Sequence, residues 1–251
     1  MGAVVVIDVG NTSTGLALWQ RGRVSGVTHI DGGIRNREAA ERAVRRLCRN
    51  GHPAGAVLGS VVPTVNAAWC GLLDELTGRP PLVVGHRLEL GVTLRYPAPA
   101  TIGADRLADA CGAVARYGAP VIVADFGTAL TFDVITPDAA YIGGVIAPGL
   151  PLMTDYLADR TALLPHIRLK GPCGAIGRST VGAMRLGAQV GYRGMVREIT
   201  RHLLDTLGWR RVTLCATGGY APWALAGLDL PFKIDPTLTL YGLGKIHDLN
   251  R

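Results

Sequence analysis

The sequence predicts an α/β protein built from two related halves. Two similar corners carry this prediction: VVVIDVGNTST near the start of the chain and VIVADFGTALTFD near its middle. In each corner an apolar, β-branched run ends in Asp, and a Gly and a Thr-rich turn follow. The two aspartates, Asp8 and Asp125, lie 117 residues apart and occupy the same place in the same order of elements, which is typical of a duplicated domain. We therefore expect two domains, 1–117 and 118–251, that pack around a central cleft.

The first half is expected to open with three strands and to continue with alternating helices and strands. Runs rich in β-branched residues, bounded by turn residues, predict strands, and apolar residues at helical spacing predict helices. The expected strands span 3–8, 14–19, 23–29, 55–61 and 81–84, and the expected helices span 36–50, 64–77 and 103–117. The last helix is followed by Gly118 and Pro120, which are typical stop signals.

The second half repeats the opening pattern. Strands are expected over 121–125, 130–136 and 140–147, and the last two are separated by a Pro137-Asp138 turn. Helices follow, with one more strand over 211–216. No Gly/Ser-rich or Pro-rich linker separates the halves, so tight packing between them is expected.

Composition favours a globular protein, and the basic charge would suit an anionic ligand or a nucleic acid but is equally typical of a solvated surface. The chain has 251 residues, of which 48% are apolar, and its formal net charge is +7. The densest basic cluster, residues 35–50, has the spacing of an amphipathic helix with Ala39, Ala43, Val44 and Leu47 turned inward. No helix-turn-helix pattern or interleaved aromatic residues accompany this cluster, so a solvated face is favoured over a DNA-binding face and a nucleic-acid partner is not expected.

Cysteine spacing and the absence of targeting signals favour a cytoplasmic protein. The five cysteines form no CxxC pair, the six histidines show no metal-ligand spacing, and the odd cysteine count favours reduced, mostly buried thiols. The apolar run from Ala3 to Ile7 is too short for the core of a signal peptide, and no apolar stretch is long enough to span a membrane.

The two Asp-Gly corners have the chemistry of phosphate-binding turns. A Gly directly after a strand exposes backbone N–H groups to a phosphate, and nearby hydroxyls add donors. The hydroxyls expected to do so are those of Thr12, Ser13, Thr14, Thr128 and Thr131. A carboxylate repels phosphate, so the aspartates would instead hold a cation such as Mg²⁺. One such corner could be an ordinary hairpin, but two favour nucleotide binding, and no P-loop or GxGxxG sequence offers another site.

Three further strings make the pattern resemble a known family. The strings YPAPATIGADR, GGVIAPG and CATGGYA lie at 96–106, 143–149 and 215–221. Two duplicated domains with paired phosphate loops are similar to the actin-like, ribonuclease H-like superfamily of kinases and chaperones. Within it, the five strings in order resemble type III pantothenate kinase. That resemblance implies a homodimer that phosphorylates pantothenate with Mg²⁺-ATP and a monovalent cation, K⁺ or NH₄⁺, at the first step of coenzyme A synthesis.

The resemblance also implies a role for individual residues. ATP would be bound by Asp8, Val9, Gly10, Asn11, Thr12, Ser13, Thr14, Gly15 and Thr128. Pantothenate would be bound by Tyr96, Gly103, Ala104, Asp105, Arg106 and Thr180, with the pocket completed across the dimer interface. Asp105 would be the general base, and Asp125 would hold the monovalent cation. Pro97 and Ala98 replace the polar pair that is usual before the next proline, which predicts a stiffer loop on the substrate side.

The residues of the GADR string suit this chemistry on physical grounds. Asp105 begins a predicted helix, where backbone N–H groups and Arg106 are expected to hold it ionised, ready to accept a proton. The guanidinium of Arg106 suits a carboxylate substrate. Without the motif, Asp105 would be interpreted as an ordinary carboxylate at the start of a helix, and Arg106 as a surface cation. GGVIAPG could equally be a tight turn that only the fold needs, and TGG a simple strand-to-helix turn.

Other functions fit the sequence less well. Sugar kinases of this layout are longer or carry a zinc motif, and polyphosphate-type phosphatases have glycines where this chain has Asn11 and Thr12. A chaperone or filament former would need a longer chain. The alternative from another class is a nucleotide-binding accessory regulator of transcription. Asp105 discriminates against it, because a regulator that only binds ATP needs no base beside a substrate-binding Arg.

Overall fold

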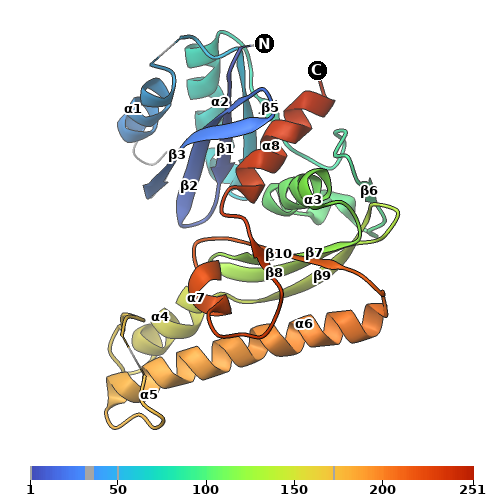
Figure 1. Ribbon diagram of the computed structural model, residues 1–251. Helices are drawn as coiled ribbons and strands as arrows, with labels where there is room; N and C mark the ends of the chain where they lie inside the picture. The colour runs from blue at the N-terminus through green and yellow to red at the C-terminus, as the bar shows by residue number, and fades with distance from the viewer. Residues whose placement is uncertain (1, 32–36, 50, 172) are drawn as a thin grey trace. The chain divides into compact units, whose positions relative to one another are not determined.

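The structure is a computed structural model that describes residues 2–31, 37–49, 51–171 and 173–251 (Figure 1). It contains two mixed β-sheets and the helices that cover them, so the predicted α/β class is confirmed. The first sheet has the strand order β3-β2-β1-β4-β5, and the second has the order β11-β10-β7-β8-β9-β6.

Strand β1 is the centre of the first sheet. It pairs antiparallel with β2 and parallel with β4, and its residues Val4, Val5, Val6 and Ile7 are buried. The strands of this sheet are β1 Val4–Val9, β2 Ser13–Gln20, β3 Arg23–Asp31, β4 Gly55–Ser60 and β5 Leu82–Val83. A strand that is apolar on both faces needs a cover on each side, because successive side chains point to opposite faces.

Helices cover both faces of this sheet. The helices near it are α1 Arg37–Leu47, α2 Pro63–Thr77, α3 Ala104–Tyr117 and α8 Leu238–Leu249. Helices α1 and α2 join the core around Val5 and Ile7 with buried residues such as Val44 and Trp69. On the other face, Leu243 of α8 lies over Gly59 of β4, and α8 also packs along α3 (Figure 1).

The remaining elements belong to the second sheet and its helices. Its strands are β6 Thr93–Leu94, β7 Val121–Phe126, β8 Ala129–Ile135, β9 Ala140–Pro148, β10 Thr213–Thr217 and β11 Lys233–Ile234. The helices are the short η2 Pro99–Thr101, then α4 Leu150–Arg160, α5 Thr180–Gly187, the π-helical turn η3 Ala188–Tyr192, α6 Arg193–Leu207 and α7 Ala221–Leu225. The two residues between β7 and β8 allow only an antiparallel connection.

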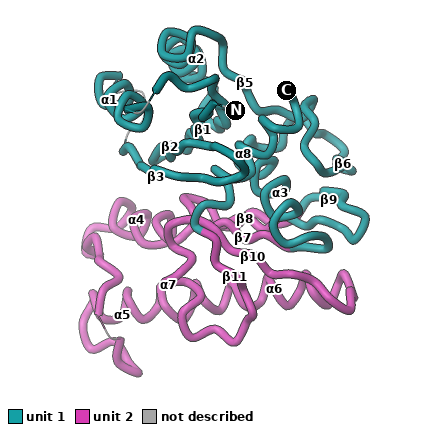
Figure 2. The backbone as a smooth tube through the Cα atoms, turned by 45° about the horizontal axis from the view of Figure 1, so that its top comes forward, with its two compact units in different colours: residues 1–121, 133–143, 236–251 teal, residues 122–132, 144–235 magenta. Residues whose placement is uncertain are grey.

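The chain divides into two compact units, coloured separately in Figure 2. Unit 1 contains residues 1–121, 133–143 and 236–251, and unit 2 contains residues 122–132 and 144–235. Unit 1 therefore includes the tip of the β8–β9 hairpin and the C-terminal helix α8. The division into duplicated domains at residue 117 stays a prediction.

The expected strands and helices are found within a few residues of their expected bounds. Of the helix expected over 36–50, residues 36 and 50 lie outside the described residues; within it, Ala40 and Val44 are buried, and Ala39, Ala43 and Leu47 are half-buried. The sequence did not predict helix α8 or the two-residue strands β6 and β11. The cysteines are unbonded as expected, but only Cys111 and Cys215 are buried. In the described ranges, no helix is both long and apolar enough to span a membrane.

Helices α3 and α8 approach each other closely at two glycines. A Cβ atom on Gly242 of α8 would lie 1.8 Å from the carbonyl oxygen of Ala108, and one on Gly112 of α3 would lie 2.8 Å from the carbonyl oxygen of Leu238. Both neighbours are main-chain atoms that cannot rotate away, so a larger residue must push the helices apart.

We expect Gly242→Ala to lower the free energy of unfolding by about 3 kcal/mol, because overpacking forces backbone shifts. The matched control is Gly71→Ala in the interior of α2, where an added Cβ would meet nothing within 4 Å. That variant should gain about 0.5–1 kcal/mol from helix propensity. Urea denaturation measures both. Equal stabilities of the two variants would contradict the close contact.

Candidate functional site

The first corner is the tight turn between β1 and β2. The N–H of Gly10 donates to the carbonyl oxygen of Ser13 at 3.0 Å, which closes the turn. Asn11 and Thr12 are exposed at its tip, and Asp8 is half-buried near the end of β1. Three other residues predicted to bind ATP, Val9, Thr14 and Gly15, are buried. The side chains available to a ligand are therefore mainly those of the turn itself.

The start of α3 lies beside the end of β1. The N–H of Val61, directly after β4, donates to the carbonyl oxygen of Val9 at 3.1 Å. Gly103, the N-cap of α3, lies against the same Val61, because a Cβ on Gly103 would be 3.2 Å from Val61 Cγ1. The DVGNT and GADR strings are far apart in the sequence. The fold of unit 1 thus brings them together at the end of the first sheet where β1 and β4 finish.

Asp105 lies in the first turn of α3, half-buried. Its Oδ1 accepts a hydrogen bond from the N–H of Arg106 at 2.8 Å. Burial raises the pKa of the Asp105 carboxyl, and the Arg106 N–H and charge only partly oppose it. Arg106 favours the ionised carboxylate, as expected, but desolvation outweighs it in the net shift of the pKa. A raised pKa makes the carboxylate a better proton acceptor.

Arg106 forms a buried ion pair with Asp133 of β8. The Asp133 Oδ1 accepts from Arg106 Nε at 2.8 Å and from Nη2 at 2.7 Å, and the side chains are 12% and 1% exposed. The hydroxyl of Tyr141 donates to the same oxygen at 2.7 Å. Burial raises the pKa of Asp133 to about 6, although Arg106 and Tyr141 favour its charged form. Asp133 also raises the pKa of the Arg106 guanidinium, which stays charged.

Tyr96 packs against Tyr141, which is hydrogen-bonded to Asp133. Its ring packs edge-on against the ring of Tyr141, with centroids 6.1 Å apart. Gly143, the first residue of GGVIAPG, has φ of 112° and leaves room for Tyr96, since a Cβ there would lie 3.2 Å from the Tyr96 ring. This contact gives Gly143 a packing role beside the predicted substrate residues.

The second corner, between β7 and β8, is enclosed by two other glycines of unit 2. A Cβ on Gly218, in the TGG string, would lie 2.4 Å from Asp125 Oδ1 and 2.6 Å from the Phe126 backbone. One on Gly149 would lie 2.1 Å from the Thr128 carbonyl oxygen. The N–H of Tyr220 donates to the Phe126 carbonyl at 3.2 Å. The TGG and GGVIAPG strings are therefore packed directly on the backbone of this corner.

Thr180 is the first residue of α5 and is exposed. Ser179 is the N-cap of this helix, and its Oγ accepts from the N–H of Gly182 at 3.0 Å. Among the predicted residues, unit 1 contains Asp8 to Gly15, Tyr96 and Gly103 to Arg106, and unit 2 contains Asp125, Thr128 and Thr180.

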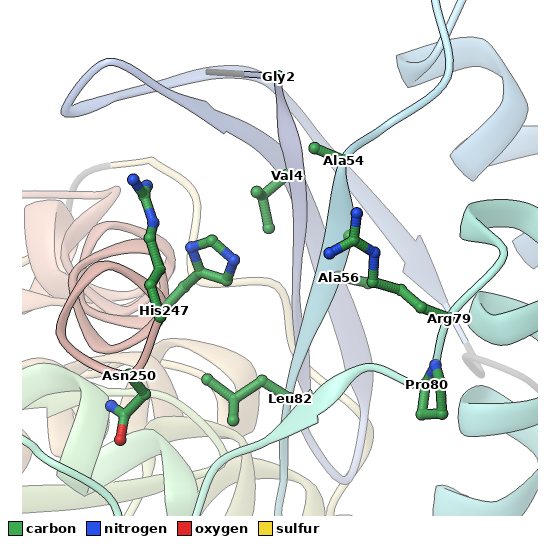
Figure 3. Close-up of a pocket in the computed structure, with 11 residues that line it drawn as sticks. Gly2, Val4, Ala54, Ala56, Arg79, Pro80, Leu82, His247 and Asn250 are labelled. Carbon is green, nitrogen blue, oxygen red and sulfur yellow. The ribbon is translucent and has the colours of Figure 1, made fainter.

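A pocket lies at the start of strands β1 and β4, whereas the DVGNT turn follows the end of β1 (Figure 3). It measures about 470 Å³ and is lined by Val4, Ala56 and Leu82 together with Arg79 and His247. None of the residues predicted to bind ATP or pantothenate lines it. In the described part of the chain, no group of three or more His, Cys, Asp or Glu side chains could hold a metal ion.

Sequence reasoning missed two residues of the site, Asp133 and Tyr141. A signal was available for Asp133, because an aspartate in the apolar run LTFDVI must be buried and needs a partner. Tyr141 follows it by eight residues across a tight turn, closed by the Thr136 N–H, which donates to the Ala140 carbonyl at 2.8 Å. The identity of the partner, Arg106, could not be read from the spacing.

The sequence is similar to one family of kinases. A sequence model described as type III pantothenate kinase matches residues 4–202. A type III pantothenate kinase from Akkermansia muciniphila is 49% identical over 78% of this chain and 78% of its own. One from Dehalococcoides mccartyi is 35% identical over 99% of this chain and 98% of its own.

Solved structures share the fold at low sequence identity. A Campylobacter jejuni protein assigned to the Baf family of transcriptional activators has a TM-score of 0.60 and 16% identity, covering 97% of both chains. A ROK family glucokinase from Streptomyces griseus, solved with glucose and AMPPNP, has a TM-score of 0.55 and 16% identity, covering 100% of this chain and 99% of its own. The predicted actin-like and sugar-kinase fold class is thereby confirmed.

We expect Gly218→Ala to destabilise the protein by about 2–4 kcal/mol, because the new methyl group would meet backbone atoms and φ is 88° at this position. Gly219→Ala is the matched control, since a Cβ on this neighbouring glycine would meet nothing within 4 Å. Thermal denaturation followed by circular dichroism compares the two. A loss of stability confined to Gly219→Ala would overturn the described packing of this corner.

Proposed function

The chain belongs to the type III pantothenate kinase family, and from this premise we propose how its residues carry out the reaction. It is a kinase that transfers a phosphoryl group from ATP to pantothenate, giving 4′-phosphopantothenate in coenzyme A biosynthesis. The observation that supports the residue assignment best is the arrangement at the start of α3, where a half-buried carboxylate with a raised pKa adjoins a fixed guanidinium.

The two Asp-Gly corners would bind the phosphates of ATP. Phosphoryl transfer depends on positioning and on neutralising charge rather than on covalent chemistry by the protein. The exposed Asn11 and Thr12 of the first corner can donate hydrogen bonds to phosphate oxygens, and Thr128 lies at the turn of the second corner. Backbone N–H groups at such turns also suit anions.

Asp105 would act as the general base. It would accept the proton of the pantothenate hydroxyl while the oxygen attacks the γ-phosphorus and ADP leaves. Arg106 would bind the carboxylate at the other end of pantothenate, and Tyr96 would line the pocket. These roles place the base and the carboxylate anchor on consecutive residues of one helical turn, and the ion pair with Asp133 holds the guanidinium of the anchor in place.

Two cations would support the reaction. Mg²⁺ would accompany ATP and neutralise its phosphate charge. The carboxylate of Asp125, held at the end of β7 under Gly218, supplies the oxygen ligand that K⁺ or NH₄⁺ requires. The monovalent ion would offset negative charge near the phosphates.

A homodimer would complete the substrate pocket. Unit 2 carries exposed apolar residues: Ile146, Leu152, Tyr156, Leu157, Leu163, Ile176 and Val190. The segment after α4 folds back along it, since His166 Nε2 lies 3.4 Å from Asp159 Oδ1. Thr180 is exposed a few residues after Ile176. A second copy that covers this apolar surface would bring Thr180 into an interface, as the proposed pocket requires.

We expect Asp105→Asn to reduce turnover by about 10²–10⁴-fold, because the amide cannot accept the hydroxyl proton. ADP release is measured with pantothenate and Mg²⁺-ATP, in K⁺ buffer and in Na⁺ buffer. Wild-type turnover should require pantothenate and K⁺. The matched control is Glu38→Gln, which removes an exposed carboxylate from the first turn of α1 and should leave turnover unchanged. Full activity of Asp105→Asn would exclude it as the base, and ATP binding without pantothenate-dependent turnover would favour a regulatory role.

We expect the wild type to sediment as a dimer and the double variant Tyr156→Glu/Leu163→Glu to sediment as a monomer. The two side chains are 59% and 88% exposed, and charges there would oppose burial in an interface. Analytical ultracentrifugation at micromolar concentration measures both. Val27→Glu, which charges an exposed apolar position of unit 1, should remain dimeric. A monomeric wild type would contradict this proposal.

A further inference from the structure

We propose that Asp133 is a positioning residue, which holds Arg106 in one orientation so that the free edge of its guanidinium selects a carboxylate on the substrate. This inference rests on the proposed pantothenate kinase function, in which Arg106 binds that carboxylate. It adds a residue from β8, far from the GADR string in the sequence, to the determinants of substrate choice.

The contacts of Arg106 define which edge is free. An arginine side chain has five N–H donors in a fixed planar arrangement. Asp133 Oδ1 accepts from Nε and from Nη2, so the edge between these two nitrogens is occupied. The edge formed by Nη1 and the second hydrogen of Nη2 remains, and two parallel N–H groups there match the two oxygens of a carboxylate. The Arg106 side chain is only 12% exposed, which limits how it can turn.

Tyr141 fixes Asp133 in turn. Its hydroxyl donates to Asp133 Oδ1 at 2.7 Å, and its ring lies 5.8 Å from the guanidinium carbon of Arg106. Tyr141 is fully buried and joined to Asp133 by the short β8–β9 connection. Three donors therefore converge on one carboxylate oxygen, and the positions of all three groups depend on one another.

A competing partner explains why fixing Arg106 matters. The charge of Asp105 already acts on Arg106 from the preceding position of the helix. If Asp133 lost its charge, Asp105 would be the nearest remaining anion, and the guanidinium would turn toward it. The carboxylate anchor and the base would then neutralise each other. By accepting from Nε and Nη2, Asp133 would hold the guanidinium away from Asp105 and leave its other edge for the substrate.

The variant that tests this is Asp133→Asn. The Asp133 Oδ2 is buried and has no hydrogen-bond partner among the residues the structure describes, so an asparagine can keep its oxygen at the Oδ1 position; it removes the charge and places an NH2 group at the Oδ2 position. The measurement is the ratio of kcat/KM for pantothenate to that for its neutral analogue, in which an alcohol replaces the carboxylate. This ratio is independent of the fraction of folded enzyme.

We expect Asp133→Asn to lower this ratio at least ten-fold, with a raised KM for pantothenate and an unchanged KM for ATP. Tyr141→Phe removes one hydrogen bond to Asp133 and keeps the ring, so it should lower the ratio by a smaller factor. This variant can be measured even if Asp133→Asn does not fold. The matched control is Asp138→Asn. Asp138 lies in the turn of the same β8–β9 hairpin, but its ion pair with Arg95 is exposed to solvent. That variant should keep the wild-type ratio.

The outcomes separate this inference from the proposed function. If the wild type phosphorylates pantothenate and prefers it to the neutral analogue, the proposed function holds. An unchanged or increased preference in Asp133→Asn and Tyr141→Phe would then overturn the positioning role, because Asp133 would only neutralise Arg106. If the wild type does not phosphorylate pantothenate, the proposed function itself fails.

Discussion

The buried ion pair between Arg106 and Asp133 connects the start of α3 to the β8–β9 hairpin. Burying a charge costs several kcal/mol unless a partner and further hydrogen bonds compensate it, and here Tyr141 supplies one of them. The geometry of the predicted substrate residues follows from this pair, because Tyr96 packs on Tyr141 and Gly143 makes room for Tyr96. Residues 133–143 belong to the same compact unit as α3, and β9 also pairs with β6 of that unit.

A buried pair of this kind is weak evidence for a stabilising role, since an apolar replacement of the same shape can be as stable. Its value here is in specificity. The pair keeps a charged guanidinium at a half-buried helix start beside a carboxylate whose pKa is raised by desolvation. Without a second anion, these two neighbours would pair with each other. In the proposed mechanism, the pair with Asp133 would keep the general base and the carboxylate anchor adjacent without letting them neutralise each other.

Much of the fold could be predicted from the sequence, because local patterns determine most of it. Apolar runs, turn residues and the Gly118 stop signal gave the strands and helices of both halves. Helix α8 was missed because its sequence is apolar around most of its surface, as its contacts with β1, β4 and α3 require, so it shows no clear periodicity. The Arg106–Asp133 pair was missed for a different reason. A partner 27 residues away is set by tertiary structure, and no local pattern records it.

The two corners that suggested a duplication share more than their strings. In each, a threonine six residues after the aspartate, Thr14 or Thr131, keeps a buried hydroxyl oxygen with no hydrogen-bond partner in the described ranges. Their surroundings differ. The first corner adjoins the start of α3, which brings a carboxylate and a guanidinium to it, whereas Gly149 and Gly218 pack so closely on the second corner that neither position has room for a side chain of its own. A similar turn thus adjoins two charged side chains in unit 1 and close backbone packing in unit 2, and the proposed function would use the first for the substrate and the second for a cation beside the ATP phosphates.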